Sequence, residues 1–265
     1  MELAIYQVDA FSSGPFSGNP AAVCLTPDGL DPPLMQKIAA EMAVSETAFL
    51  ALNSRQLRWF TPLAEVDLCG HATLATAHIL RQTGQLDVGQ SIEFTTLSGP
   101  LTATARQQTI ELDFPLSPPD MRHVPDERML NALGLHESEI VACGKFGAKE
   151  MIVLEDALLI DRLKPDFQAL AAIPGRGVAV TAPGHNGYDF ISRYFAPWVG
   201  VNEDPVTGSA HCALAAYWSE RLGKPTLAAW QASARGGALQ IALSETGRVL
   251  LSGQAHTVLC GRLFI

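Results

Sequence analysis

The chain has 265 residues, of which 48% are hydrophobic and 17% are charged, so we expect a globular protein with one large domain or two of ordinary size. The net charge of −9 disfavours a surface that binds nucleic acid or an anionic membrane. The five cysteines are odd in number and include no C-x-x-C pair, which disfavours a disulfide framework and a thiolate zinc site. The sequence shows neither a signal peptide nor a long apolar segment, and it predicts a cytoplasmic protein without a membrane partner.

The predicted elements indicate an α+β fold in which short strands outnumber helices. In the first half, the residue patterns predict strands at 3–8, 47–52, 57–60, 91–96, 101–105 and 109–114. A helix is predicted after Asp31, because two prolines follow this acid and Leu34, Ile38 and Met42 then share one face. In the second half we expect a helix at 127–133, strands near 140–143, 151–154, 177–181 and 188–194, and a long helix at 209–222.

A proline-rich stretch at residues 115–125 is the best candidate for a linker. The pattern of strands and helices starts again after it. We therefore predict two domains, 1–117 and 118–265. The sequence leaves open whether the last strand, at about 257–265, returns to the first domain.

An internal repeat supports this division. Superposing Gly70 on Gly208 aligns His71 with Ser209, and both segments run from a turn, through glycine, into an alanine-rich helix. Such helices are common enough for the likeness to be coincidental, but two copies favour a duplicated domain. Alanine-rich helices also suit burial, because small side chains let the surrounding strands approach on every side.

The two glycine-led helix starts have a chemical consequence. The first N–H groups of a helix have no partner within it, and the helix dipole adds positive potential there. Such a helix start can bind a carboxylate or phosphate without lysine or arginine. Two of them are expected to form anion-binding walls around a cleft, which would let an acidic protein hold an anionic substrate.

Four side chains near these turns are candidates for chemistry. His71 opens the first helix, and Ser209 opens the second, five residues after Asp204. Each has a structural alternative: Asp204 can organise a turn, Ser209 can cap a helix, and a single histidine is more often structural than catalytic. Glu46 begins an apolar strand and lies either at its solvated end or in a buried place. A buried carboxyl holds its proton closer to neutral pH, which suits a group that both takes and returns a proton.

Seven segments carry a resemblance to the PhzF-like family of phenazine biosynthesis isomerases. They are FSGNPAAV (16–23), SETAF (45–49), WFTP (59–62), EVDLCGHAT (65–73), SRYFAP (192–197), NEDPVTGSAH (202–211) and QASARGG (231–237). The resemblance spans nearly the whole chain. It implies the fold of diaminopimelate epimerase, in which two similar domains each wrap a mostly antiparallel, barrel-like sheet around a central helix, with the active site in the cleft between them.

The resemblance also implies an activity: isomerisation of a small cyclic or conjugated carboxylate by proton transfer, without a metal or organic cofactor, in a homodimer. Glu46 corresponds to the family's proton-shuttling glutamate, and His71 to the histidine that holds substrate. Asp204 and Ser209 match residues that contact polar substituents. The expected substrate-binding residues around the two helix starts are Gly70, Ala72, Thr73, Thr207 and Gly208.

Two alternatives remain at this stage. The first is an amino-acid epimerase or racemase that uses Glu46 with Cys69. Related epimerases use one cysteine from each half, but the second motif here runs from Asp204 to Ser209, and Cys212 falls a helical turn later. A two-thiol mechanism is therefore disfavoured, and Cys69 is expected to be structural. The second alternative is a binding protein without catalytic activity.

Overall fold

The computed structural model describes all 265 residues, and the chain divides into two units. The first unit comprises Met1–Phe114 together with Leu250–Ile265, and the second comprises Pro115–Val249. None of the helices has the length and apolar character that crossing a bilayer requires.

The first unit is a mixed sheet with two helices. Its elements are β1 (Glu2–Ala10), β2 (Asn19–Thr26), α1 (Pro32–Met42), β3 (Glu46–Ala51), β4 (Gln56–Phe60), β5 (Glu65–Val66), α2 (Gly70–Gln82), β6 (Ser91–Thr96), β7 (Gly99–Ala105), β8 (Ile110–Pro115) and β17 (Ala255–Phe264). Most neighbours pair antiparallel, but β2 pairs parallel with β3, and β4 pairs parallel with β6. Each parallel pair is joined by a connection that contains a helix, as a parallel crossover requires.

The second unit is built in the same way. Its elements are α3 (Glu127–Leu133), a 3-10 turn η1 (Glu137–Glu139), β9 (Ile140–Phe146), β10 (Lys149–Leu154), α4 (Ala157–Arg162), α5 (Phe167–Ala171), β11 (Val178–Pro183), β12 (Phe190–Ala196), a 3-10 turn η2 (Pro197–Val199), β13 (Val201–Asp204), α6 (Gly208–Leu222), β14 (Thr226–Gln231) and β15 (Gly237–Leu243). Strand β16 (Arg248–Gly253) contains the boundary between the units.

The strand pairings repeat in the same order. From β1 to β7 in the first unit, successive pairings are antiparallel, parallel, antiparallel, antiparallel, parallel and antiparallel. From β9 to β15 in the second unit, the order is identical. In both units a long helix joins the second parallel pair. The duplication predicted from two glycine-led helices therefore extends over the whole of each unit.

Helix α2 forms the core of the first unit. Every residue from 71 to 80 is buried, and the helix packs against β1, β2, β3, β7 and β17. The Thr73 and Thr76 hydroxyls donate to carbonyl oxygens one turn earlier, at 2.6 and 2.8 Å, which satisfies them in an apolar environment. In the second unit α6 packs against β14 and β15, and buries most of its residues from 208 to 218. The expected central helices are thus present.

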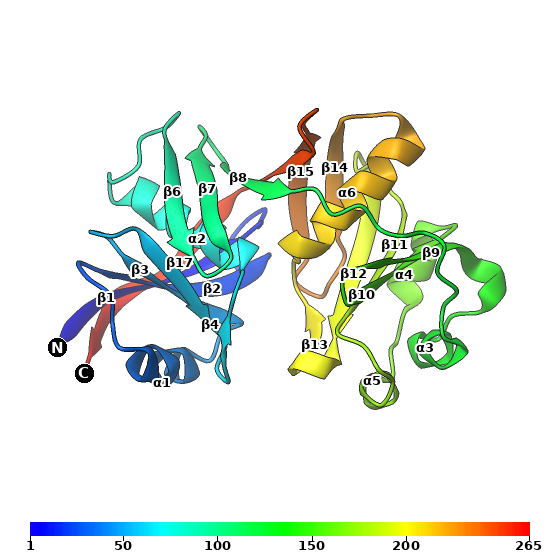
Figure 1. Ribbon diagram of the computed structural model, residues 1–265, viewed down its shortest axis with the longest axis horizontal. Coiled ribbons are helices and arrows are strands. Elements are labelled where there is room, and N and C mark those ends of the chain that lie inside the picture. Colours follow the sequence, from blue (N-terminus) through cyan, green and yellow to red (C-terminus); the bar gives the residue numbers. More distant parts are fainter. The chain divides into compact units, whose positions relative to one another are not determined.

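The last strand belongs to the first unit. Strand β17 pairs antiparallel with β1 from Glu2↔Phe264 to Ala10↔Ala255, and the two strands lie side by side in Figure 1. The Ile265 N–H also donates to the Met1 carbonyl at 2.9 Å, which joins the two ends of the chain. The sequence predicted a second domain over 118–265 and left open where the last strand packs. In the structure this strand completes the sheet of the first unit.

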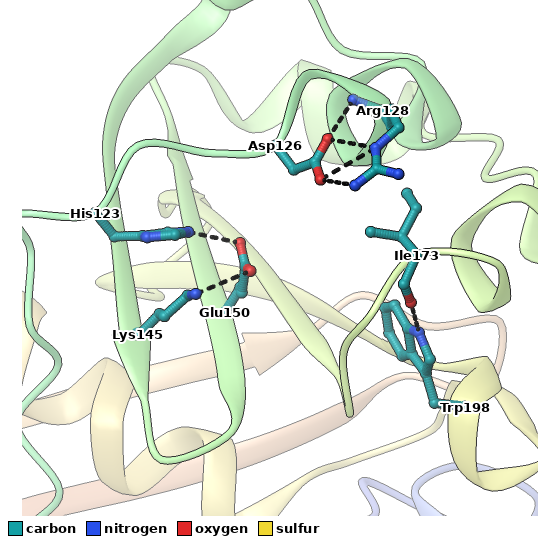
Figure 2. A network of polar contacts seen from close by, with 7 residues as sticks. All are labelled: His123, Asp126, Arg128, Lys145, Glu150, Ile173 and Trp198. Atoms are coloured by element: carbon teal, nitrogen blue, oxygen red, sulfur yellow. Dashed lines mark hydrogen bonds and ion pairs between the residues drawn. The ribbon is translucent and has the colours of Figure 1, made fainter.

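Polar contacts fix the surface of the second unit around β9, β10 and α3 (Figure 2). The Glu150 carboxylate lies 3.2 Å from His123 Nε2 and 3.8 Å from Lys145 Nζ. Asp126 caps α3 by accepting a hydrogen bond from the Arg128 N–H at 2.9 Å. Lys149, the residue before Glu150, is not among the residues of this network (Figure 2).

Candidate active site

Glu46 is the first residue of β3. The sequence left open whether a carboxyl at this end of the strand is solvated or buried. The parallel pairing with β2 places it opposite Ala21. Its side chain is 19% exposed, and its Oε2 atom lies 3.0 Å from His71 Nε2, which is an ion-pair distance. The carboxyl is therefore neither fully buried nor on the open surface, and it contacts the histidine that the sequence singled out.

His71 is the second residue of α2 and is buried at 6% exposure. Its Nδ1 atom lies 3.2 Å from Asn19 Nδ2, and the side-chain oxygen Oδ1 of Asn19 accepts a hydrogen bond from Ser45 Oγ at 3.1 Å. Asn19 was quoted only as part of a motif, and its orienting role was missed. The sequence gives no signal for this role, because the contact joins residues 52 positions apart.

Opposed effects set the pKa of His71. Burial lowers it, whereas Cys69 and Glu46 raise it, and the pKa of His71 is held well above its usual value of 6.5. Burial, followed by the Glu46 charge, raises the pKa of Cys69 to about 11. The Cys69 thiol is therefore neutral at physiological pH, and Glu46 supplies the negative charge next to the ring.

Cys69 lies against His71, with its sulfur 3.5 Å from Nδ1 and 3.9 Å from Nε2. A neutral, buried thiol is a weak base, so this contact is consistent with the structural role expected for Cys69. Cys212, in the second unit, is also buried, and burial raises its pKa to about 12. Neither thiol is activated as a base.

Glu46, Cys69 and His71 are the residues that could hold a metal ion. One ligand atom from each lies within 4.8 Å of the others. Carboxylate, thiolate and imidazole are all zinc ligands, and such a site would require Cys69 to lose its proton.

Asp204 is held in a turn by two polar side chains of the second unit. Its carboxylate accepts a hydrogen bond from the Thr207 hydroxyl at 2.6 Å, and its backbone carbonyl accepts one from Gln231 Nε2 at 2.7 Å. Gln231 is fully buried, and its Oε1 atom accepts from the Thr207 N–H at 2.8 Å. Gln231 therefore fixes the turn before α6.

Ser209 is exposed at the start of α6, and its hydroxyl accepts a hydrogen bond from Lys149 Nζ at 2.8 Å. The sequence analysis did not single out Lys149. It is a lone lysine beside a turn, and only the folded structure brings it to Ser209. Asp204 and Ser209 both lie on the segment that enters α6, as the motif predicted.

Two of the predicted substrate-binding residues use their polar groups within the protein. The Thr73 hydroxyl and N–H both donate to the Cys69 carbonyl, at 2.6 and 3.1 Å, and Thr73 is fully buried, so neither group is left for a substrate. Thr207 uses its hydroxyl for Asp204 and its N–H for Gln231, so it supports the turn. Gly70, Ala72 and Gly208 lie in the first turns of α2 and α6, where N–H groups lack partners within the helix.

The fold is the diaminopimelate epimerase-like fold that the sequence predicted. A hydroxyproline epimerase from Agrobacterium vitis superposes with a TM-score of 0.59 over 99% of this chain and 92% of its own, at 13% identity, which shows the fold alone. A crystal structure of a phenazine biosynthesis protein of the PhzF family from Enterococcus faecalis superposes with a TM-score of 0.93, at 41% identity over 100% of both chains.

The chain belongs to the PhzC–PhzF family of phenazine biosynthesis-like proteins, whose model matches residues 8–261. A relative named as an uncharacterized isomerase, from Halalkalibacterium halodurans, is 48% identical over 100% of both chains. The family resemblance predicted from seven motifs is therefore confirmed.

Proposed function

We propose that the protein is an isomerase that moves a proton within a small cyclic or conjugated carboxylic acid, with Glu46 as the acid/base group. The observation that carries this proposal is the 3.0 Å contact between the Glu46 carboxyl and the buried His71 ring. This contact holds the carboxyl in one orientation at the start of β3, as a group that takes and returns a proton at fixed positions requires.

In the proposed reaction Glu46 removes a proton from a carbon that neighbouring unsaturation has made acidic. The electron pair of the broken C–H bond moves into the conjugated system, and Glu46 returns the proton to another carbon of the same frame. The substrate is neither oxidised nor reduced, so the step needs no electron acceptor. Asp204 and Ser209, in the second unit, are assigned to the polar groups of the substrate.

The test is a screen of cyclic and amino carboxylic acids for deuterium uptake from D₂O by mass spectrometry. For any acid that exchanges, Glu46→Gln should lower the exchange rate by about a thousandfold, the upper part of the range for general acid–base catalysis, while binding is kept. Glu41→Gln, at an exposed position of α1, is the matched control and should exchange like the wild type. Undiminished exchange by Glu46→Gln would show that another group moves the proton.

A further inference from the structure

Lys149 occupies an unusual position in the second unit. It is the first residue of β10 and is only partly exposed, and its ammonium lies 5.8 Å from the Phe146 ring centroid and 5.7 Å from that of Tyr194. The Tyr194 hydroxyl lies against Gly177, where a Cβ would collide with it. The acceptor of the ammonium is the neutral hydroxyl of Ser209, at 2.8 Å. These direct contacts, two aromatic faces and a hydroxyl, carry no charge themselves.

This arrangement costs free energy that a purely structural lysine would avoid. Partial burial, followed by repulsion from Arg176, lowers the pKa of Lys149, while Cys212 and Asp204 oppose the shift. By contrast, Lys145 on the neighbouring strand is half exposed and lies 3.8 Å from the Glu150 carboxylate (Figure 2). Lys145 thus contacts a carboxylate, whereas the hydrogen-bond partner of Lys149 is a neutral hydroxyl.

The repeated fold gives this position a counterpart. In the first unit Asn19 is the first residue of β2, and its side chain contacts His71, the residue after the helix-opening glycine of α2. In the second unit Lys149 is the first residue of β10 and contacts Ser209, the residue after the helix-opening glycine of α6. The same scaffold position orients the functional side chain in both units. In the second unit it also carries a positive charge.

The direction of the hydrogen bond matters for recognition. Because the Ser209 oxygen accepts from Lys149, its own proton is free to donate elsewhere. The ammonium and the hydroxyl thus form a pair of donors on an exposed helix start. We propose that Lys149 determines the specificity of the isomerase for anionic substrates: it binds the substrate carboxylate and holds the Ser209 hydroxyl as a second donor. This inference rests on the proposed function.

The test compares benzoate with benzamide, a neutral molecule of nearly the same shape, in NMR titrations of ¹⁵N-labelled protein. Lys149→Met and Lys149→Gln should each raise the Kd for benzoate about 10- to 100-fold, since hydrogen bonds to charged groups are worth that much. The Kd for benzamide should not change, and Lys149→Arg should restore most of the benzoate affinity. Lys145→Met is the matched control and should bind both molecules like the wild type.

Two outcomes would overturn the inference. One is a wild-type protein that binds benzoate no more tightly than benzamide, because the ammonium would then give no preference for an anion. The other is unchanged benzoate affinity in folded Lys149→Met and Lys149→Gln proteins. Neither result bears on proton transfer, which the Glu46→Gln exchange experiment tests separately. Continued exchange by Glu46→Gln would contradict the role of Glu46. The role of Lys149 in binding a carboxylate would still be decided by the benzoate titration.

Discussion

The contact between Glu46 and His71 predicts how the pKa of His71 changes when Glu46 loses its charge. Replacing Glu46 with glutamine keeps the shape of the side chain and removes the charge, so the pKa of His71 should fall. An NMR titration of the histidine ring protons of both proteins measures this. An unchanged pKa would show that Glu46 does not supply the negative charge that His71 senses.

The sign of the effect on stability follows from the same shift. A histidine whose pKa is raised on folding stabilises the folded protein fully below its unfolded pKa of about 6.5, and this contribution is lost as the pH rises through the folded value. The free energy of unfolding of the wild type, measured in urea, should therefore fall as the pH rises through the folded pKa of His71. Glu46→Gln should show a smaller loss.

Cys69 provides a second prediction at the scale of one residue. Cys69→Ser should keep most of the deuterium exchange of the wild type, because a buried thiol with a pKa of about 11 does not act as the base. The buried hydroxyl should lower the free energy of unfolding by about 1–3 kcal/mol. Exchange is measured by mass spectrometry and stability by urea unfolding. Complete loss of exchange in a folded variant would favour thiol-dependent epimerisation or a metal site at Glu46, Cys69 and His71.

The sequence singles out the candidate side chains more readily than the residues that hold them in place. Glu46, His71, Asp204 and Ser209 stand out because polar residues at the starts of apolar elements are uncommon. Asn19, Lys149 and Gln231 do not, since an amide or a lysine at a strand end fits many surface positions. Their partners lie between 24 and 60 residues away along the chain, and only folding brings them together.

At the scale of the elements, the turn between β13 and α6 depends on Gln231. Replacing it with leucine should leave the buried Thr207 N–H unpaired, at a cost of about 1–3 kcal/mol, and should remove the amide donor from the Asp204 carbonyl. We expect Gln231→Leu to destabilise the protein by about 2–4 kcal/mol and to accelerate hydrogen exchange of the Thr207 amide. Urea unfolding and hydrogen-exchange NMR measure the two effects.

The control for this experiment is Gln240→Leu, at an exposed position of β15, which should leave both quantities near the wild-type values. Wild-type protection of the Thr207 amide in Gln231→Leu would mean that another group holds the turn. The Gln231 amide would then not be the group that holds Asp204 in place.

The elements themselves were predicted unevenly. Helix α3 and strand β6 have the predicted bounds, because capping and alternation define them locally. On α1, Ile38 is buried as expected, but Met35 and Ala39 are buried beside it, while Leu34 and Met42 are only partly buried. Strands β2 and β13 and the short helices α4 and α5 were missed. Glycine and proline around β2, and the shortness of the others, hide them from patterns that need several regular repeats.

At the scale of the whole molecule, the sequence predicted two similar halves but not the path of the chain. The pairing of β1 with β17 joins residues about 250 positions apart, and no local pattern encodes such a partner. The repeated strand order, by contrast, could be inferred from two short motifs because a duplicated domain repeats its whole topology. Only the structure therefore shows that β1 and β17, which are far apart in the sequence, pair with each other.

Acid stability is a property of the whole molecule that both units influence. His78, in the first unit, and His211, in the second, are buried, and burial lowers the pKa of each to about 4. The unfolded chain binds these protons near pH 6.5, so the folded protein loses stability as the pH falls from about 6.5 to about 4. For His211 the loss amounts to roughly 3 kcal/mol at most.

His211 allows the sharper test, because one ring nitrogen contacts the Thr207 carbonyl at 2.9 Å while Nε2 is buried without a partner. His211→Phe keeps an aromatic ring beside Phe190, whose centroid lies 5.9 Å from that of His211. We expect the variant to lose stability less steeply than the wild type between pH 6.5 and 4, as measured by urea unfolding across that range. His185→Phe, at an exposed position, should keep the wild-type slope. If His211→Phe keeps it as well, proton uptake by His211 does not drive the acid sensitivity, and the buried His78 becomes the group to replace.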